Sequence, residues 1–426
     1  MKFLYADSLD YVDSKFDFIE DSSAEDRKPY WDDSFTHEMH NEVPYSGLLI
    51  SRSVVGDPVK TGRYTQAQSM YFRRVGARKF LRLEKKKYSK LWIMGDCGAF
   101  NYHKMKVPPY TPKDTVEFYN DGQFTHGCAV DHIIFDFDTQ EVPLKHVTQD
   151  NRDRFNITLQ YAQEFITETK KSKATFIPVG VIQGWSPKSM AKSAQSLIKM
   201  GYSFLALGGM APLSTDKIEH ALTEVKEVLP TNKVVHLHLL GYGKITELER
   251  LKRFNIGSLD TSSPMVRSFT DSKNNYIYPI TKKELAWYTA LRIPQSLENL
   301  NLKNLVKEGL VKQETLTRLE HKSLISIRNF DIGKAEVDNV INDILEYSKF
   351  LYEYKKGEYT RKNAMKSLLE NYKKTLESKI WKKCSCNICS NAGIEVMIFR
   401  GSNRNKRRGM HNCYHFHKYL KAIHRT

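Results

Sequence analysis

Residues 175–209 read TFIPVGVIQGWSPKSMAKSAQSLIKMGYSFLALGG, and this stretch contains one complete strand–helix–strand unit. The apolar runs at 175–182 and 204–207 predict two buried strands. Between them, residues 186–200 predict an amphipathic helix. Its apolar face carries Met190, Ala194 and Leu197. Alternation of this kind predicts a parallel sheet that is covered on both faces.

The same alternation extends from about residue 45 to residue 285. The short apolar runs lie at residues 47–51, 90–94, 132–137, 175–182, 204–207, 234–240 and 257–259. About seven such units over this length suit a (β/α)8 barrel better than an open doubly wound sheet. We therefore expect an α/β protein with a TIM-like (β/α)8 barrel over residues 46–281.

Polar residues or glycines follow several of the predicted strands. They are Asp96, Asp136, Asp138, Gln183, Gly208, Gly209, Gly241, Gly243 and Asp260. In a barrel these positions converge on one rim, where active sites lie. An aspartate after a strand is also a common helix N-cap. For Asp96 and Asp260, the other polar residues and glycines expected at the same rim favour a role in a site. For Asp138 the site and cap interpretations are evenly matched, because Asp136 lies two residues away and would point to the same side of a strand. Asp131 is interpreted as a loop residue.

The regions outside the barrel have a different character. Residues 1–45 form an N-terminal segment, residues 282–380 predict a helical insertion rich in Leu, Lys and Glu, and residues 381–426 form a C-terminal subdomain. Within the insertion, a basic and aromatic face could lie along a phosphate backbone, although solvated scaffold helices are the simpler interpretation. That face comprises Tyr352, Tyr354, Lys355, Lys356, Tyr359 and Arg361.

The C-terminal subdomain contains a cysteine block at residues 384–389, CSCNIC, followed by His411. Three thiolates and one imidazole complete the tetrahedral ligand set of a structural zinc ion and leave no position open for water. The predicted ligands are Cys384, Cys386, Cys389 and His411, with Cys413, His415 and His417 as alternatives for the fourth position.

The charge of the chain suggests a polyanionic partner. Its 426 residues include 66 Lys and Arg against 49 Asp and Glu, a formal net charge of +17. Nucleic acid is the simplest partner for such a surplus. The first stretch of the chain is acidic, whereas no acidic residue follows Glu395. The predicted clamp on nucleic acid comprises Arg404, Lys406, Arg407 and Arg408, with Arg267 as a further phosphate contact.

Targeting signals and membrane spans are not expected. No apolar run approaches the length of a membrane-spanning helix, and the first residues, MKFLYAD, lack the apolar region of a signal peptide. We therefore expect no membrane partner and a cytoplasmic location, in a bacterium or a phage-infected cell. Disulfides are not expected in such a reducing compartment.

The ordered motifs resemble those of the tRNA-guanine transglycosylase superfamily, most closely its DpdA branch, which exchanges guanine for a 7-deazaguanine in DNA. The similar segments are residues 94–101 (MGDCGAFN), 137–139 (FDT), 181–184 (VIQG), 206–210 (ALGGM), 240–243 (LGYG) and 259–261 (LDT), with the cysteine block and His411-Asn412. The resemblance covers roughly residues 45–280 and 380–420. Ala99 and Asn101 depart from the Gly and Gln of the tRNA enzymes, and residues 282–380 have no counterpart there.

The resemblance implies a role for each matching residue. Asp260 is the expected nucleophile, which attacks C1′ of the nucleotide and forms a covalent glycosyl intermediate, and Asp96 moves a proton on the purine. Asp138 would accept from the donor edge of the base, while Gln183 and backbone groups at Gly208 and Gly209 would bind its carbonyl. Stacking on the ring would come from Phe100, Tyr102 or Tyr242.

The expected reaction is therefore replacement of guanine in DNA by 7-cyano-7-deazaguanine or a derivative. The expected partners are DNA, from which the base must be flipped out, and the free 7-deazaguanine base, with an accessory ATPase and a homodimer left open. Two alternatives remain. One is a tRNA-guanine transglycosylase that acts on tRNA, and the other is a non-catalytic zinc-containing nucleic-acid-binding partner.

Overall fold

The structure is a computed structural model that describes residues 1–56, 62–141, 143–352 and 358–424. The chain forms two compact units. The barrel unit comprises Met1–Leu9, Tyr45–Ser262 and Leu420–Thr426, and the second unit comprises Asp10–Pro44 and Ser263–Tyr419.

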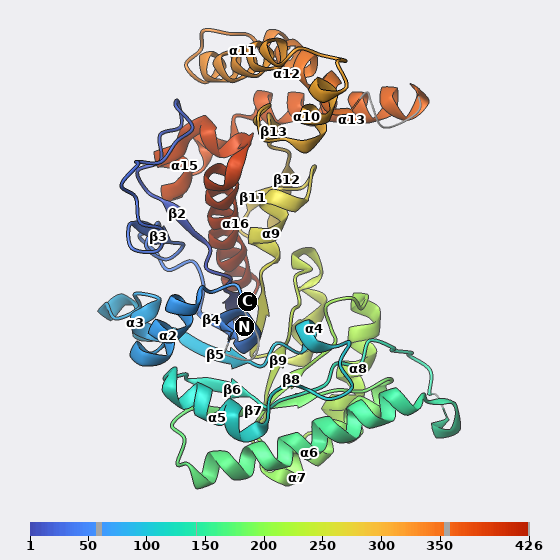
Figure 1. The fold of residues 1–426 in the computed structure, drawn as a ribbon. Helices are drawn as coiled ribbons and strands as arrows, with labels where there is room; N and C mark the ends of the chain where they lie inside the picture. Colours follow the sequence, from blue (N-terminus) through green and yellow to red (C-terminus); the bar gives the residue numbers. More distant parts are fainter. Residues whose placement is uncertain (57–61, 142, 353–357, 425–426) are drawn as a thin grey trace. The chain divides into compact units, whose positions relative to one another are not determined.

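The barrel unit contains a closed barrel of eight parallel strands, which confirms the expected fold (Figure 1). In spatial order the strands are β1 (Lys2–Ala6), β10 (Ser258–Thr261), β9 (His236–Leu239), β8 (Phe204–Leu207), β7 (Ile177–Ile182), β6 (His126–Cys128), β5 (Trp92–Asp96) and β4 (Gly47–Ser51).

The first strand corrects the expected domain boundary at residue 45. Leu4 of β1 lies opposite Asp260 of β10 on one side and Gly47 of β4 on the other, so β1 closes the barrel. Residues 10–44 belong to the second unit instead. The sequence pattern missed β1 because its partner strand β10 is about 255 residues away, so no local alternation marks the pair.

Strand β6 also lies elsewhere than expected. It is the three-residue strand β6, which ends at Cys128, whereas residues 132–137 belong to no strand. The sequence HGC has weak strand propensity because it contains a central glycine, so the apolar run downstream gave the stronger signal. This shift changes which aspartate stands at the rim of the barrel.

Alternate side chains of the strands fill the barrel, as expected for a small closed barrel. The cluster comprises Leu4, Leu49, Met94, Cys128, Val179, Val181, Phe204 and Ala206. The helices of this unit are α1 (Arg52–Val55), α2 (Gln66–Val75), α3 (Ala77–Phe80), α4 (Ala99–Tyr102), α5 (Pro112–Asp121), α6 (Gln149–Lys171), α7 (Pro187–Met200) and α8 (Thr215–Glu227). Short 3₁₀ helices lie at Lys86–Tyr88, Leu144–His146, Ile245–Glu247 and Arg250–Phe254.

The second unit is mainly helical. Its strands form three small sheets: β2 (Tyr11–Asp13) with β3 (Asp33–Phe35), β11 (Tyr276–Thr281) with β12 (Glu284–Tyr288), and β13 (Leu291–Arg292) with β14 (Ile398–Phe399). Its helices are α9 (Ser263–Thr270), α10 (Leu300–Lys307), α11 (Gln313–Asp331), α12 (Val337–Tyr352), α13 (Glu358–Ser378), α14 (Ile380–Lys383), α15 (Asn387–Ala392) and α16 (Gly401–Ile423), with a 3₁₀ helix at Gly393–Met397.

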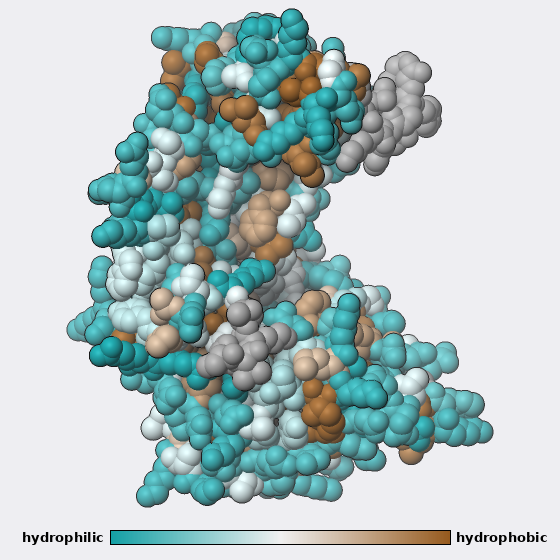
Figure 2. All heavy atoms as spheres, in the orientation of Figure 1, coloured by the Kyte–Doolittle hydropathy of each residue, from teal (hydrophilic) through white to brown (hydrophobic). Residues whose placement is uncertain are grey.

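The expected insertion is therefore helical from α10 to α13. Of its basic and aromatic face, Tyr354, Lys355 and Lys356 and the side chains of Tyr359 and Arg361 lie outside the described residues. The surface in Figure 2 is largely hydrophilic, with hydrophobic residues in small separate groups. None of the described helices has both the length and the hydrophobicity needed to cross a membrane.

Candidate active site and metal centre

A pocket of about 160 Å³ lies at the carboxyl ends of the barrel strands. This volume is well below the roughly 300–1,000 Å³ of pockets that enclose drug-sized ligands, and it suits a small planar group such as one nucleobase. Its lining includes the polar side chains of Asp96, Asp131, Gln183 and Asp260, the glycines Gly208, Gly209 and Gly241, and the aromatic rings of Phe100 and Phe135.

Asp96 is the last residue of β5, as the sequence predicts. The backbone N–H of Gly98 donates to its Oδ2 at 3.0 Å. Gly98 has φ +83°, and a Cβ there would lie 2.0 Å from Oγ of Ser53, so only glycine fits at this turn. Burial, followed by the negative charges of Asp131 and Asp260, raises the pKa of Asp96 to about 7. A carboxyl group of this kind can both give and take a proton near neutral pH.

The second carboxylate of the pocket is Asp131, which corrects the expectation for Asp138. Asp131 is buried three residues after β6 and lines the pocket. Asp138 is exposed, and its Oδ1 accepts from the backbone N–H of Gln140 at 3.0 Å. Asp136 is also exposed and accepts from the side chain of Asn151. Because β6 ends early, the carboxylate of Asp131 reaches the rim.

Gln183 directly follows β7, and Gly208 and Gly209 directly follow β8, where the sequence predicts them. Nε2 of Gln183 donates to Oδ2 of Asp131 at 2.6 Å, and its Oε1 accepts from the N–H of Ile134 at 3.1 Å. A Cβ at Gly208 would lie 2.2 Å from this Nε2, so the glycine makes room for the amide. Burial raises the pKa of Asp131, while the hydrogen bonds from Cys97 and Gln183 oppose the rise.

Asp260 is buried on β10 and is held through one oxygen. Its Oδ1 accepts from Nε2 of His238 and from the N–H of Gly241, each at 3.0 Å. The other ring nitrogen of His238 lies 2.8 Å from the hydroxyl of Ser258. Among the described residues, neither hydrogen bond uses Oδ2, which leaves that oxygen for an incoming group. In the sequence, His238 stands within an apolar run, a pattern typical of a core histidine, although the side chain lies beside the expected nucleophile.

Of the three aromatic residues predicted to stack on the base, one lines the pocket and two do not. Phe100 lines the pocket and is 63% exposed, which suits a ring that stacks on a ligand. Tyr242 is buried, and its hydroxyl lies 3.1 Å from Oγ1 of Thr215, so its expected stacking role is wrong. Tyr102 is buried as well and donates to the backbone oxygen of Asp131.

The predicted metal ligands come together in the second unit. Cys384, Cys386, Cys389 and His411 are buried, and their ligand atoms all lie within 4.8 Å of one another. The three sulfurs lie 3.6, 3.3 and 3.3 Å from Nδ1 of His411. Tetrahedral zinc with its usual bond lengths would separate such atoms by about 3.5 Å, so the donor set fits this ion.

The surroundings of His411 favour it as the fourth ligand over the alternatives. Its Nε2 donates to the backbone oxygen of Ile277 at 2.7 Å, which turns the Nδ1 lone pair toward the thiols. Cys413 is buried and is not a member of this group, and His415 contacts only Cys384 among the three cysteines, at 3.1 Å. The site can therefore hold a metal ion with four protein ligands.

Residues 123–265 match the sequence family described as Queuine tRNA-ribosyltransferase. The chain is also 36% identical over 415 residues to the DNA-guanine transglycosylase of Salmonella montevideo, which covers 97% of this chain and 94% of that protein. The chain belongs to the guanine transglycosylase family. This transglycosylase is thus an enzyme of the pentosyltransferase class.

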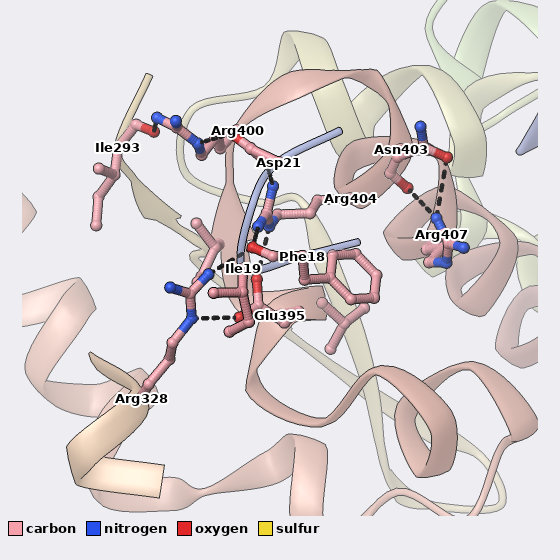
Figure 3. Close-up of polar contacts among 12 residues, drawn as sticks. Phe18, Ile19, Asp21, Ile293, Arg328, Glu395, Arg400, Asn403, Arg404 and Arg407 are labelled. Atoms are coloured by element: carbon pink, nitrogen blue, oxygen red, sulfur yellow. Dashed lines mark hydrogen bonds and ion pairs between the residues drawn. The ribbon is translucent and has the colours of Figure 1, made fainter. Parts of the chain in front are cut away.

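The basic C-terminal segment of the transglycosylase does not form the expected clamp. Arg404, Arg407 and Arg408 of α16 are buried, and their guanidinium groups are engaged within the second unit. Figure 3 shows Arg404 and Arg407 among their partners. Arg404 pairs with Asp21 and, at 2.7 Å, with Glu395. The run of basic residues in the sequence does not reveal this pairing, because the acidic partner Asp21 lies 383 residues away from Arg404 in the chain.

The other two arginines bind mainly backbone carbonyl groups. Arg407 donates to the backbone oxygen of Asp13 at 2.5 Å. Arg408 donates to the backbone oxygens of Val396, Ile398 and Ser268 at 3.0, 3.2 and 2.6 Å. The predicted phosphate contacts of these arginines are therefore wrong, because the guanidinium groups already bind the protein.

The two remaining basic residues are partly exposed. Lys406 donates to the backbone oxygen of Tyr11 at 3.3 Å, and Arg267 lies over the ring of Trp287 at 5.0 Å. Neither contact consumes all the donors of its side chain. A phosphate contact at Lys406 or Arg267 remains a prediction.

Proposed function

We propose that this transglycosylase replaces guanine in DNA with a 7-deazaguanine, such as 7-cyano-7-deazaguanine, through a covalent intermediate on Asp260. The observation that carries the proposal is the small pocket in which Asp96, Asp131, Gln183 and Asp260 converge. The similarity to a DNA-guanine transglycosylase over 97% of the chain supports DNA as the substrate. The family match described as Queuine tRNA-ribosyltransferase makes tRNA the second candidate.

The first half of the reaction forms the intermediate. Oδ2 of Asp260 attacks C1′ of the deoxyribose, the bond from C1′ to N9 breaks, and its electron pair leaves with the guanine. Asp96, which is largely protonated up to about pH 7, gives its proton to the leaving guanine. His238 and Gly241 hold Oδ1 of Asp260, so the carboxylate is aligned before the attack.

The second half reverses the steps with a new base. N9 of the 7-deazaguanine attacks C1′ and displaces Asp260, while the N9 proton passes to the Asp96 carboxylate. Asp96 and Asp260 thus return to their starting states, and no oxidant or reductant is consumed. A raised pKa suits a group that gives a proton in one half and takes it in the other.

Recognition of both bases would come from the same polar set. The carboxylate of Asp131 would accept from the N1 and N2 donors of a guanine-like ring, and Gln183 and the N–H of Gly209, which line the same pocket, would donate to its carbonyl. The 7-position differs between the two bases, whereas this donor and acceptor edge is shared. One pocket can therefore bind both.

The metal site would hold a structural zinc ion. The four protein ligands fill the tetrahedral shell, so the ion would stabilise the second unit rather than bind a reacting group. Zinc bound in this way contributes folding free energy.

The test is nucleoside mass spectrometry after incubation with 7-cyano-7-deazaguanine, with plasmid DNA and tRNA in parallel reactions. We expect the 7-deazaguanine deoxynucleoside from the wild type and none from Asp260→Ala. Product in tRNA alone would overturn the DNA assignment, and full activity of Asp260→Ala would overturn the covalent mechanism. An unchanged thermal midpoint of Asp260→Ala is the control for folding.

A further inference from the structure

Exposed apolar side chains lie at the rim of the base pocket and on the segment that follows α4 in the chain. Phe100 and Phe135 line the pocket, and their rings meet edge to face with centroids 5.9 Å apart. The adjoining segment 103–107 carries Met105 and Val107, which are 44% and 49% exposed. Figure 2 shows hydrophobic residues at the surface of the barrel unit close to where Figure 1 draws α4. Exposed apolar side chains gathered beside a ligand pocket are typical of an interaction surface.

The segment is held in place despite its exposure. Nε2 of His132, which is buried, donates to the backbone oxygen of Met105 at 2.8 Å. Nδ1 of His103 lies 2.7 Å from the backbone oxygen of Phe100, and the N–H of Met105 donates to Tyr102 at 2.8 Å. The exposed side chains thus project from an anchored backbone.

Positive charge alternates with the apolar residues of this segment. Lys104 and Lys106 flank Met105, and both lysines are exposed. Among the described residues neither lysine takes part in an ion pair, unlike Arg404 of α16. The pattern Lys-Met-Lys-Val therefore offers ammonium groups to phosphates and apolar groups to bases within one short segment.

We propose that residues 103–107, together with Phe100 and Phe135, form a wedge that enters double-stranded DNA beside the target guanine. The wedge rests on the proposed function, because it explains how a paired guanine reaches a pocket that holds one base. A flipped base leaves a gap in the stack and costs a few kcal/mol. Met105 or Val107 fills that gap, as apolar side chains do in proteins that kink DNA, while Lys104 and Lys106 bind the flanking phosphates.

The test measures unstacking of the duplex without any base exchange. The probe is a panel of short DNA duplexes with a single guanine, each with 2-aminopurine beside it, covering all neighbouring sequences. We expect wild-type protein to raise 2-aminopurine fluorescence on at least one duplex by about threefold, because the stack opens next to the flipped base. Met105→Ser/Val107→Ser should abolish the rise, and Lys104→Ala/Lys106→Ala should weaken binding in a salt-dependent way.

The matched control is Lys233→Ala/Val234→Ser, an exposed Lys-Val pair that precedes β9 at the opposite end of the barrel. It should behave as wild type. An equal rise with Met105→Ser/Val107→Ser, or no rise with wild type on any duplex, would overturn the wedge. Base exchange is measured separately by mass spectrometry, so a protein that unstacks DNA but exchanges no base would contradict the proposed function and not the wedge.

Discussion

Nε2 of His238 lies 3.0 Å from Oδ1 of Asp260 in the interior of the barrel. A carboxylate can only accept, so the ring nitrogen donates, and the hydroxyl of Ser258 can donate to the opposite nitrogen at 2.8 Å. The two strands β9 and β10 pair in parallel, with His238 beside Ser258 in register. The proposed nucleophile is thereby fixed through one oxygen by an element that also forms the barrel wall.

Replacement of His238 by alanine should therefore slow the chemical step. We expect kcat to fall about 10- to 100-fold with a small change in KM, since a misplaced nucleophile costs rate more than binding. His238→Gln, which can still donate to Asp260, should recover part of the loss. His236→Ala is the control, because His236 lies on the same strand and is exposed. Equal losses in the Ala and Gln variants would contradict the positioning role.

Asp131, rather than Asp138, should govern affinity for the base. Asp131→Asn replaces an acceptor in the pocket by an amide, and we expect KM for the free base to rise about 10- to 100-fold, the range for a hydrogen bond to a charged group. Asp138→Asn should stay within about twofold of wild type, since this side chain is exposed and outside the pocket lining. Steady-state kinetics at varied concentrations of the 7-deazaguanine base measures both KM values. A larger rise in KM for Asp138→Asn than for Asp131→Asn would restore Asp138 as the residue that binds the base.

The raised pKa of Asp96 predicts the pH dependence of the first half-reaction. Protonated Asp96 is the donor, so the rate of covalent complex formation should be constant below about pH 7 and fall about tenfold per pH unit above it. Single-turnover trapping of the protein–DNA complex measures this rate. Asp96→Asn should be slow and should lack the decline. A wild-type rate that rises above pH 7 would contradict the donor role.

The Asp21–Arg404 pair should stabilise the second unit. Asp21→Asn leaves the buried Arg404 with one fewer negative partner, so the free energy of unfolding should fall by about 3 kcal/mol near pH 7. Burial acts to raise the pKa of Asp21, but Arg404 and Arg400 outweigh it and lower that pKa. Because the folded pKa is lowered, the stabilisation is present above the unfolded value near 4 and is lost as the pH falls through the folded value.

Urea unfolding near pH 7 and near pH 3 checks this difference, which should shrink at the lower pH. Asp26→Asn is the matched control, because Asp26 is an exposed aspartate of the same segment. A loss of stability that is equal in the two variants would rule out a specific role for the ion pair.

Metal removal should destabilise the protein. Chelation, or Cys386→Ser, leaves buried thiols without their ion, and we expect a fall of at least about 10 °C in the thermal midpoint together with loss of about one equivalent of zinc. Elemental analysis and thermal unfolding measure both. Cys413→Ser, which removes a buried cysteine outside the cluster, should keep the metal content. A protein that retains zinc after Cys386→Ser would have a different ligand set.

Several features could be predicted because local sequence carries them. The alternation of strands and helices predicts most of the barrel. Residues at the carboxyl ends of strands reach the rim in any parallel barrel, so Asp96, Gln183 and Asp260 could be predicted as residues of the pocket. The cysteine block and His411 were found because ligand spacing in the sequence reflects the geometry of the ion. These inferences need only neighbours in the chain and the periodicity of secondary structure.

Other features depend on partners that are distant in sequence. β1 is a barrel strand only because it pairs with β10, and Asp131 replaces Asp138 only because β6 ends at Cys128. In the sequence, the arginines of α16 resemble a surface clamp. The folded chain brings Asp21 to Arg404, and this pairing shows that Arg404 is not free to bind phosphate.

The sequence alone therefore determined the chemical groups and their order around the barrel, because backbone periodicity sets which residues reach one rim. Only the tertiary structure decided which of these groups face the pocket and which charges neutralise one another. Burial and pairing depend on contacts between residues hundreds of positions apart, and no local pattern encodes them.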